Sequence, residues 1–517
     1  MTMQGMLAAL DLEAFQRFIE ATGADLRHLL PECLLALTAC LLLLLDTFFE
    51  RARSRKLAWL ALAGTFGSFA LLIARFGEAP VRIFRAIGAP EGAQGMLAVD
   101  DFANFFGVVF LAGTAVTIVL AHVSKELKDC PMGEFYSLLL MAVLGMFLTV
   151  EATDLLMIFV SIELLSIPSY VLVGWLKKSR ASTEAALKYV IYGSVSAAVM
   201  LYGFSLFFGM TGSLKLGAIA ALAEAPDSNR YAIALAALLS FAGFGYKMAS
   251  VPMHFWAPDV YEGAPTSITA WLSVTSKAAG VGLFLRFMDA LGLGRLMTQF
   301  AEGPTDWVTL VAILSSVTMT LGNLAALFQS NAKRLLAYSS IAHVGYILMG
   351  VAAFGASYVA GWQAVAFYLV AYLLMNLGAF TCVLLIANQL GTEEIDGYRG
   401  LGVRAPVLAL GFAIFLISLI GIPPTAGFTG KFQLFLVAID QGLIWLVVVA
   451  AVNTAISVYY YARILKALYL DETISGERVP VSAVGTGLVL FQVAAVLYLG
   501  IFFNQLSGLT REIGILR

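Results

Sequence analysis

Apolar runs of about 20 residues recur along this chain, and short polar joints separate them. A helix needs about 20 apolar residues to cross a bilayer, and these runs lack the strict alternation of barrel strands. The pattern therefore predicts an all-α integral membrane protein with about 14 transmembrane helices. The predicted spans are 29–49, 57–76, 102–122, 134–152, 155–176, 183–210, 230–262, 266–290, 305–328, 333–355, 360–389, 406–439, 443–469 and 481–505.

Composition supports a protein that is surrounded by lipid. Hydrophobic residues make up 60% of the chain and charged residues only 12%, with a mean hydropathy of +0.89. A soluble domain carries about twice that charged fraction. The formal net charge is −2 and no basic patch is present, so the partner that we expect is the lipid bilayer and not nucleic acid.

The sequence shows no sign of a cofactor. It contains neither a GxGxxG nor a P-loop pattern, and its four cysteines form no CxxC. We therefore expect no disulfide framework, metal site, flavin, nicotinamide, nucleotide or iron–sulfur cluster in this chain. The stretch 1–27 carries several acidic residues and lacks the basic start and compact apolar run of a cleavable signal peptide.

Two of the predicted spans are interrupted. Span 230–262 contains Pro252, and span 406–439 contains Gly421, Pro423 and Pro424. Proline removes a helix donor and glycine loosens the turn, so we expect two broken helices. Paired interruptions at matching positions are typical of transporters built from inverted repeats.

A second similarity supports such repeats. Tyr170 and Gly174 in the fifth span have the same spacing as Tyr346 and Gly350 in the tenth. We predict two five-helix repeats of opposite topology at 134–290 and 305–470. The remaining parts are 1–133, with the first three spans, and 480–517, with the last span and the C-terminus.

The positions of lysine and arginine predict the orientation, because cytoplasmic loops are enriched in them. We therefore place the joints after odd-numbered spans in the cytoplasm and both termini outside. The joints after odd-numbered spans carry Arg51, Arg53, Arg55, Lys56, Lys125, Lys128, Lys177, Lys178, Arg180, Lys333, Arg334, Arg399 and Arg404, and those after even-numbered spans carry only Arg82, Arg85, Lys215, Arg230 and Arg295.

Several ionisable residues lie inside predicted spans. A charge near the bilayer centre costs about 2.5–3.5 kcal/mol on insertion scales, so such residues usually have a function. Buried lysines give up a proton readily, and a nearby carboxylate restores it, which makes proton transfer the chemistry that this set suits. The candidate relay residues are Glu163, Lys188, Lys247, Lys277, His343 and Lys431, with Tyr189, Tyr192, Ser276 and Ser340 as possible lining.

Simpler interpretations exist for the same residues. Glu163 and Lys247 could form a static ion pair, and Lys188 could extend its ammonium to the membrane interface. His343 could be a neutral buried histidine bonded to a backbone carbonyl. The position of Lys247 and Lys431 beside the two interruptions favours the relay.

One stretch is distinctive. Residues 247–266 read Lys-Met-Ala-Ser-Val-Pro-Met-His-Phe-Trp-Ala-Pro-Asp-Val-Tyr-Glu-Gly-Ala-Pro-Thr. This resembles a signature of the antiporter-like membrane subunits of proton-pumping NADH:quinone oxidoreductase, respiratory complex I. The part at 255–263 resembles the subunit N form, equivalent to mitochondrial subunit 2. The resemblance covers the third to fourteenth spans and leaves out 1–27 and 77–100.

The resemblance implies a proton-translocating membrane subunit of the bacterial plasma membrane. Such a subunit has no redox centre of its own, and quinone, flavin and iron–sulfur clusters belong to partner subunits. Its partners would be the other antiporter-like subunits and the quinone-site subunits. The implied roles are a tuning glutamate for Glu163, relay lysines for Lys188, Lys247 and Lys277, a polar linker for His343 and an exit lysine for Lys431.

Two other functions remain open at this point. A free-standing or multisubunit cation/proton antiporter would share the fold and the lysines, although the subunit N form of residues 256–263 argues against it. A passive structural membrane subunit would not need the buried glutamate and lysines.

Overall fold

The structure is a computed structural model that describes residues 22–48, 54–85, 95–225, 228–290, 307–355, 358–473, 477–511 and 513. Residues 1–21, most of the stretch judged not to be a signal peptide, lie outside these ranges, as do Arg51, Arg53 and Arg295. Within the described ranges, twelve helices are long and apolar enough to cross a membrane. A thirteenth span results if Thr22–His28 and Leu30–Asp46, bent by 89°, are counted as one.

The helices follow the predicted spans closely, which confirms the all-helical membrane fold. Before and within the first predicted repeat lie α3 (Leu30–Asp46), α5 (Ala58–Arg75), α6 (Asp101–Val123), α7 (Met132–Glu151), α8 (Leu155–Val173), α9 (Arg180–Thr211), α10 (Leu216–Glu224), α11 (Arg230–Met248), α12 (Trp256–Gly263), α13 (Thr266–Trp271) and α14 (Lys277–Ala290). After them lie α16 (Trp307–Ala326), α17 (Ala332–Ala352), α18 (Tyr358–Leu390), α19 (Leu401–Arg404), α20 (Pro406–Ile420), α21 (Ala426–Asp440), α22 (Ile444–Tyr469), α23 (Ala483–Ile501) and α24 (Phe503–Arg511).

The difference between about 14 predicted spans and the twelve or thirteen found has a simple cause. The predicted span 406–439 consists of α20 and α21, each 15 residues long and too short to cross a bilayer alone. Together they form the second broken helix. The first comprises α11 and α12.

Polar residues in the joints fix where helices begin. The side chain of Asp154 accepts hydrogen bonds from the backbone N–H groups of Leu156 and Met157 at the start of α8. Ser179, Asn229 and Asn331 cap α9, α11 and α17 in the same way. These side chains satisfy N–H groups that the first helical turn leaves free.

Both interruptions end a helix in left-handed backbone. Ala249 follows α11 with φ 58°, and Gly421 follows α20 with φ 91°. The chain resumes as a helix at Trp256 and at Ala426. A third distortion lies between α13 and α14, where Leu272–Ser276 form a π-helical turn directly before Lys277.

Glycines allow the closest helix contacts. A Cβ atom built on Gly145 of α7 would lie 2.5 Å from the backbone nitrogen of Leu165 in α8. A Cβ atom on Gly345 of α17 would lie equally close, 2.5 Å, to the backbone nitrogen of Met319 in α16. Small residues are common where membrane helices pack, because they let the backbones approach closely.

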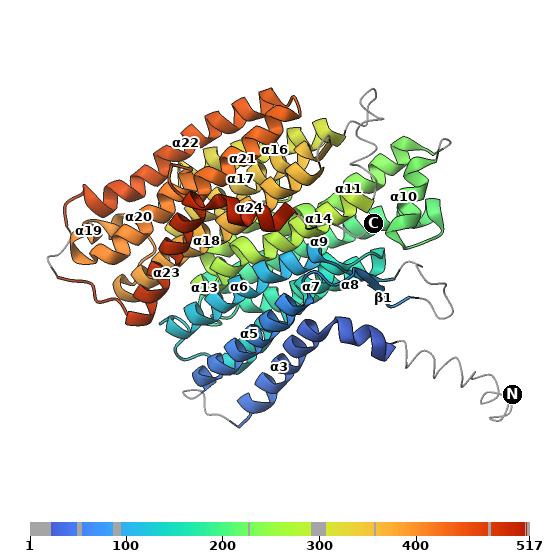
Figure 1. Cartoon of the computed structure of the whole chain (residues 1–517). Coiled ribbons are helices and arrows are strands. Elements are labelled where there is room, and N and C mark those ends of the chain that lie inside the picture. Colours follow the sequence, from blue (N-terminus) through green and yellow to red (C-terminus); the bar gives the residue numbers. More distant parts are fainter. Residues whose placement is uncertain are drawn as a thin grey trace.

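The helices run roughly along one direction, and colour changes gradually across the bundle (Figure 1). At one end a hairpin pairs β1 (Val81–Ile83) with β2 (Leu97–Val99) antiparallel, with Val81 opposite Val99. This hairpin lies within the stretch 77–100, and Leu97 bridges to Ala152 after α7. The short helix α19 lies at the opposite end (Figure 1). We call these the hairpin end and the α19 end.

Candidate functional site

Four of the six predicted relay residues are deeply buried. Lys247 is 1% exposed, Lys277 and His343 2%, and Lys431 4%. They come from α11, α14, α17 and α21, and thus from both predicted repeats. We call these four residues the buried row.

Lys247 lies against aromatic rings. Its Nζ is 5.7 Å from the ring centre of Tyr189 and 5.6 Å from that of Tyr246. Among the residues that the structure describes, this Nζ has no hydrogen-bond partner. Half-buried Glu163 of α8 attracts the ammonium electrostatically, yet no direct ion pair between these two described residues is present. Lys247 is therefore held by faces of rings and by a carboxylate at a distance.

Lys277 connects the two predicted repeats. Its Nζ donates a hydrogen bond of 2.6 Å to Oγ of Ser340 in α17. The ammonium also lies 5.6 Å from the ring centre of Tyr261 in α12. The π-helical turn before Lys277 shifts the register of the span at this point.

His343 lies one turn beyond Ser340 on α17. Its Nδ1 is 2.6 Å from the hydroxyl of Tyr368, and its ring centre is 4.9 Å from that of Tyr372. A tyrosine hydroxyl, and not a backbone carbonyl, is therefore the partner of this nitrogen.

Lys431 completes the buried row beside the second interruption. Its Nζ donates hydrogen bonds to the carbonyl oxygens of Leu419 (3.0 Å) and Ile420 (2.9 Å), at the end of α20. The last carbonyls of a helix have no partner within it, so the break supplies these acceptors. The ammonium lies 4.5 Å from the ring centre of Tyr346, which belongs to the tenth-span Tyr–Gly pair.

The structure places Lys188 outside the buried row. Its Nζ forms ion pairs with Glu184 at 2.8 Å and with Asp259 at 2.6 Å, and its side chain is 37% exposed. Asp259 also binds Arg334 at 2.6 Å, and Arg334 binds Glu262 at 2.7 Å. Lys188 thus belongs to an ionic cluster that links α9, α12 and α17.

The predicted lining residues divide into two groups. Tyr189, Ser276 and Ser340 are buried beside the buried row, whereas the Tyr192 side chain is 44% exposed. Sequence reasoning missed Tyr261, Tyr346, Tyr368 and Tyr372, which form most of the wall around the lysines and the histidine. Tyr261 lies within the signature stretch, Tyr346 belongs to the tenth-span Tyr–Gly pair, and Tyr368 and Tyr372 lie on α18; these positions were the only signal available.

Several polar atoms in this wall lack a protein partner. In the described part of the chain, the hydroxyls of Tyr189, Tyr261 and Ser276 are buried without a hydrogen bond, as is Lys247 Nζ. Buried polar groups normally have a partner, which water often provides. The part of the site around Lys247 and Lys277 therefore holds polar atoms that water could bind, although it lies among apolar helices.

Known proteins resemble this chain over most of its length. Residues 152–457 match the protein family "NADH:quinone oxidoreductase/Mrp antiporter, TM". The chain is 44% identical over 444 residues to NADH-quinone oxidoreductase subunit N 2 of Chloroherpeton thalassium, covering 84% of this chain and 85% of that protein. It is 43% identical over 520 residues to NADH-quinone oxidoreductase subunit N of an Anaeromyxobacter species, covering 95% and 97%.

Solved structures extend the similarity to three dimensions. A chain of respiratory complex I from Thermus thermophilus with bound aureothin has a TM-score of 0.77 and 33% identity, covering 94% of this chain and all of that one. A chain of the Mrp complex from a Dietzia species has a TM-score of 0.80 at 21% identity, covering 93% and 96%, which shows a common fold.

Proposed function

Since this chain belongs to the NADH-quinone oxidoreductase subunit N family, and so is a proton-translocating membrane subunit of bacterial respiratory complex I, we propose that the buried row is its proton path. Glu163 tunes Lys247 at one end, and Lys277 and His343 carry protons through the middle. Lys431 passes them on at the other end, and Lys188 feeds the path from the α19 end.

The observation that carries this proposal is the Lys277–Ser340 hydrogen bond of 2.6 Å. This bond joins α14, which begins at Lys277, to α17, which carries His343. The two helices belong to separate predicted repeats. His343 follows Ser340 by one helical turn and leads through Tyr368 toward the wall around Lys431. Protons can pass along such a row when water fills the polar gaps between its members.

The charges around the buried row suit transient proton binding. In the described part of the chain, no row lysine forms an ion pair with a carboxylate; ring faces, hydroxyls or backbone carbonyls hold each ammonium. None of these partners fixes the positive charge as firmly as an ion pair would. Each lysine can therefore lose and regain its proton as neighbouring charges change.

The energy for this cycle comes from outside the chain. We place the quinone site, the flavin and the iron–sulfur clusters in partner subunits of the complex. Other membrane subunits of the complex contact this subunit within the bilayer. We place the α19 end in the cytoplasm and both termini outside, because Lys125 and Arg334 lie at the same end as the α19 loops. Protons then enter near Lys247 and leave near Lys431.

The direct test removes the hydrogen bond between Lys277 and Ser340, which links the two predicted repeats. In the whole complex reconstituted into vesicles, Lys277→Ala should lose most NADH-driven proton uptake. Ser340→Ala removes one hydrogen bond worth about 1 kcal/mol, so it should slow uptake about fivefold. Ser339→Ala is the matched control, since the neighbouring buried Ser339 bonds to Tyr461 and not to the buried row.

Two results would contradict the proposal. One is wild-type proton uptake by the Lys277→Ala complex, assembled at normal levels. The other is an equal effect of Ser339→Ala and Ser340→Ala, which would point to packing of α17 as the cause.

A further inference from the structure

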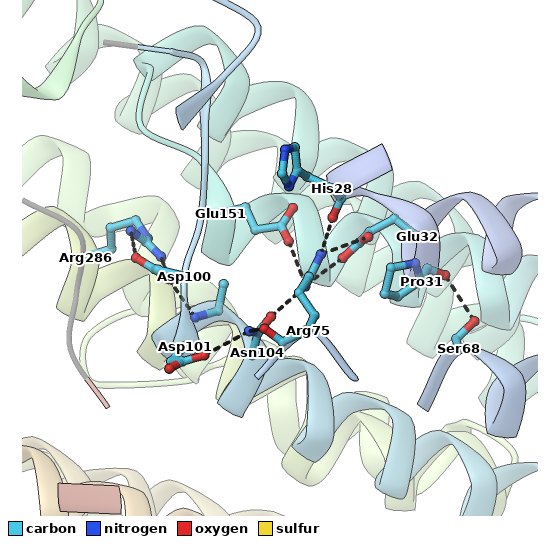
Figure 2. Close-up of polar contacts among 11 residues, drawn as sticks. His28, Pro31, Glu32, Ser68, Arg75, Asp100, Asp101, Asn104, Glu151 and Arg286 are labelled. Atoms are coloured by element: carbon cyan, nitrogen blue, oxygen red, sulfur yellow. Dashed lines mark hydrogen bonds and ion pairs between the residues drawn. The ribbon is translucent and has the colours of Figure 1, made fainter. Parts of the chain in front are cut away.

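A second group of buried charges lies at the hairpin end, away from the buried row. Figure 2 shows Arg75 of α5 between Glu32 of α3 and Glu151 of α7. Its Nη2 is 3.1 Å from Oε1 of Glu32 and 3.4 Å from Oε1 of Glu151. The side chains of Arg75, Glu32 and Glu151 are 6%, 3% and 0% exposed, so bulk water solvates neither carboxylate.

The other donors of Arg75 are already used. Its Nη1 donates to the backbone oxygen of His28 at 2.8 Å and also to Oε2 of Glu32 at 3.2 Å, and its Nε donates to Oδ1 of Asn104 at 2.7 Å (Figure 2). A single guanidinium therefore faces two carboxylates. It can balance the charge of only one of them.

The nearest second cation has its own partner. Arg286 of α14 holds Asp100 through two hydrogen bonds of 3.0 and 2.8 Å, and its Nε donates to the backbone oxygen of Val150. Arg286 attracts Glu151 only at longer range. A buried carboxylate without a paired cation is costly, since burial removes its hydration.

Two other acidic residues near this site have partners of their own. Asp101 accepts a hydrogen bond from Asn104 at 3.2 Å, and Asp154 pairs with Lys215 at 3.2 Å. Within the described residues, Oε2 of Glu151 is buried and accepts no hydrogen bond. This oxygen is therefore free to bind or share a proton with the neighbouring carboxyl.

We propose that Glu32 and Glu151 share one proton and so form a proton-binding site distinct from the buried row. With that proton, one carboxylate balances Arg75 and the cluster has no excess charge. Two carboxyl groups that share one site commonly ionise one at a time, for the same reason.

This pair lies close to the ends of helices that carry proposed relay residues. Glu151 lies three residues before Asp154, which caps the helix that carries Glu163. Arg286 lies on α14, which begins at Lys277. The site therefore lies at the hairpin end of two helices that carry proposed relay residues.

Infrared difference spectroscopy of the whole complex tests the proposal. The wild type minus Glu151→Gln spectrum should contain the carbonyl stretching band of a protonated carboxyl group, shifted in heavy water. The wild type minus Glu32→Gln spectrum should contain the same band, because in either variant one remaining carboxylate faces Arg75 alone and ionises. Glu134→Gln, an exposed change at the start of α7, is the control and should leave the band in place.

The outcomes separate clearly. Persistence of the band in either Gln variant would overturn the shared proton. If the variants fail to assemble, wild-type complex labelled with ¹³C-carboxyl glutamate provides a second measurement. The labelled complex should show a shifted protonated-glutamate band, and its absence would overturn the proposal as well. The variant spectra report protonation at Glu32 and Glu151, so they do not depend on whether the buried row carries protons.

Discussion

The two lysines beside the interrupted helices are held in different ways. Lys247 precedes its break, has no hydrogen-bond partner among the described residues and feels the field of Glu163. Lys431 follows its break and donates to two carbonyls that the break itself exposes. The first lysine interacts with a side-chain carboxylate at a distance, and the second binds backbone carbonyls directly. The comparison suggests that loading is adjustable at Lys247 and that release at Lys431 is set by the helix break.

The largest effect should come from Lys431. Lys431→Ala should abolish NADH-driven proton uptake in vesicles that contain the whole complex, because a proton that cannot leave keeps the upstream residues loaded. Lys431→Arg should do nearly as much harm, since arginine scarcely ever releases its proton. Lys431→Glu should retain part of the activity, because a buried carboxyl can also bind and release protons.

A surface lysine provides the control for these changes. Lys466 is exposed, and its side chain pairs with Asp471 at 3.1 Å. Lys466→Arg should pump like the wild type. If Lys431→Arg also pumps like the wild type, Lys431 does not cycle its proton and the outward path runs elsewhere.

Proton pumping should be less sensitive to a conservative change at Glu163, which acts on Lys247 from a distance. Lys247→Ala should depress pumping strongly, whereas Glu163→Gln keeps the shape of the side chain and removes only its charge. We expect Glu163→Gln to lower pumping by a smaller factor than Lys247→Ala. Proton uptake at normal complex levels is the measurement, and Glu134→Gln is the control. Normal pumping in both Glu163→Gln and Glu163→Ala would remove Glu163 from the mechanism.

Much of this fold could be predicted from local sequence. Span positions follow from hydropathy, and both interruptions follow from proline and glycine at Pro252, Gly421 and Pro423. The π-helical turn at Leu272–Ser276 could not be predicted, because Leu-Ser-Val-Thr-Ser contains neither residue. The domain limits and the inverted relation of the two repeats remain predictions.

The candidate site was predictable where the bilayer makes charge expensive. The four members of the buried row lie within predicted spans. The free-energy cost of a charge in the bilayer therefore singled them out as functional candidates. Tyr368 and Tyr372 were not singled out, since tyrosine in an apolar span is ordinary packing. Glu32, Arg75 and Glu151 lie near the ends of predicted spans, where charge is common, and only the folded chain brings them together.

The smallest effect should come from Lys188. Its variants test whether the ionic cluster takes part in proton transfer. Its two ion pairs are partly exposed, so their loss should cost about 1 kcal/mol or less of stability, while Asp259 keeps Arg334 as a partner. Lys188→Ala should therefore leave the complex assembled and lower pumping only modestly. The informative variant is Lys188→Arg, which keeps both ion pairs but holds its proton. If Lys188 only positions Asp259, the arginine variant should pump like the wild type. If Lys188 feeds protons to Lys247, as we propose, the arginine variant should be at least as impaired as the alanine variant, and proton uptake in the two complexes distinguishes these roles.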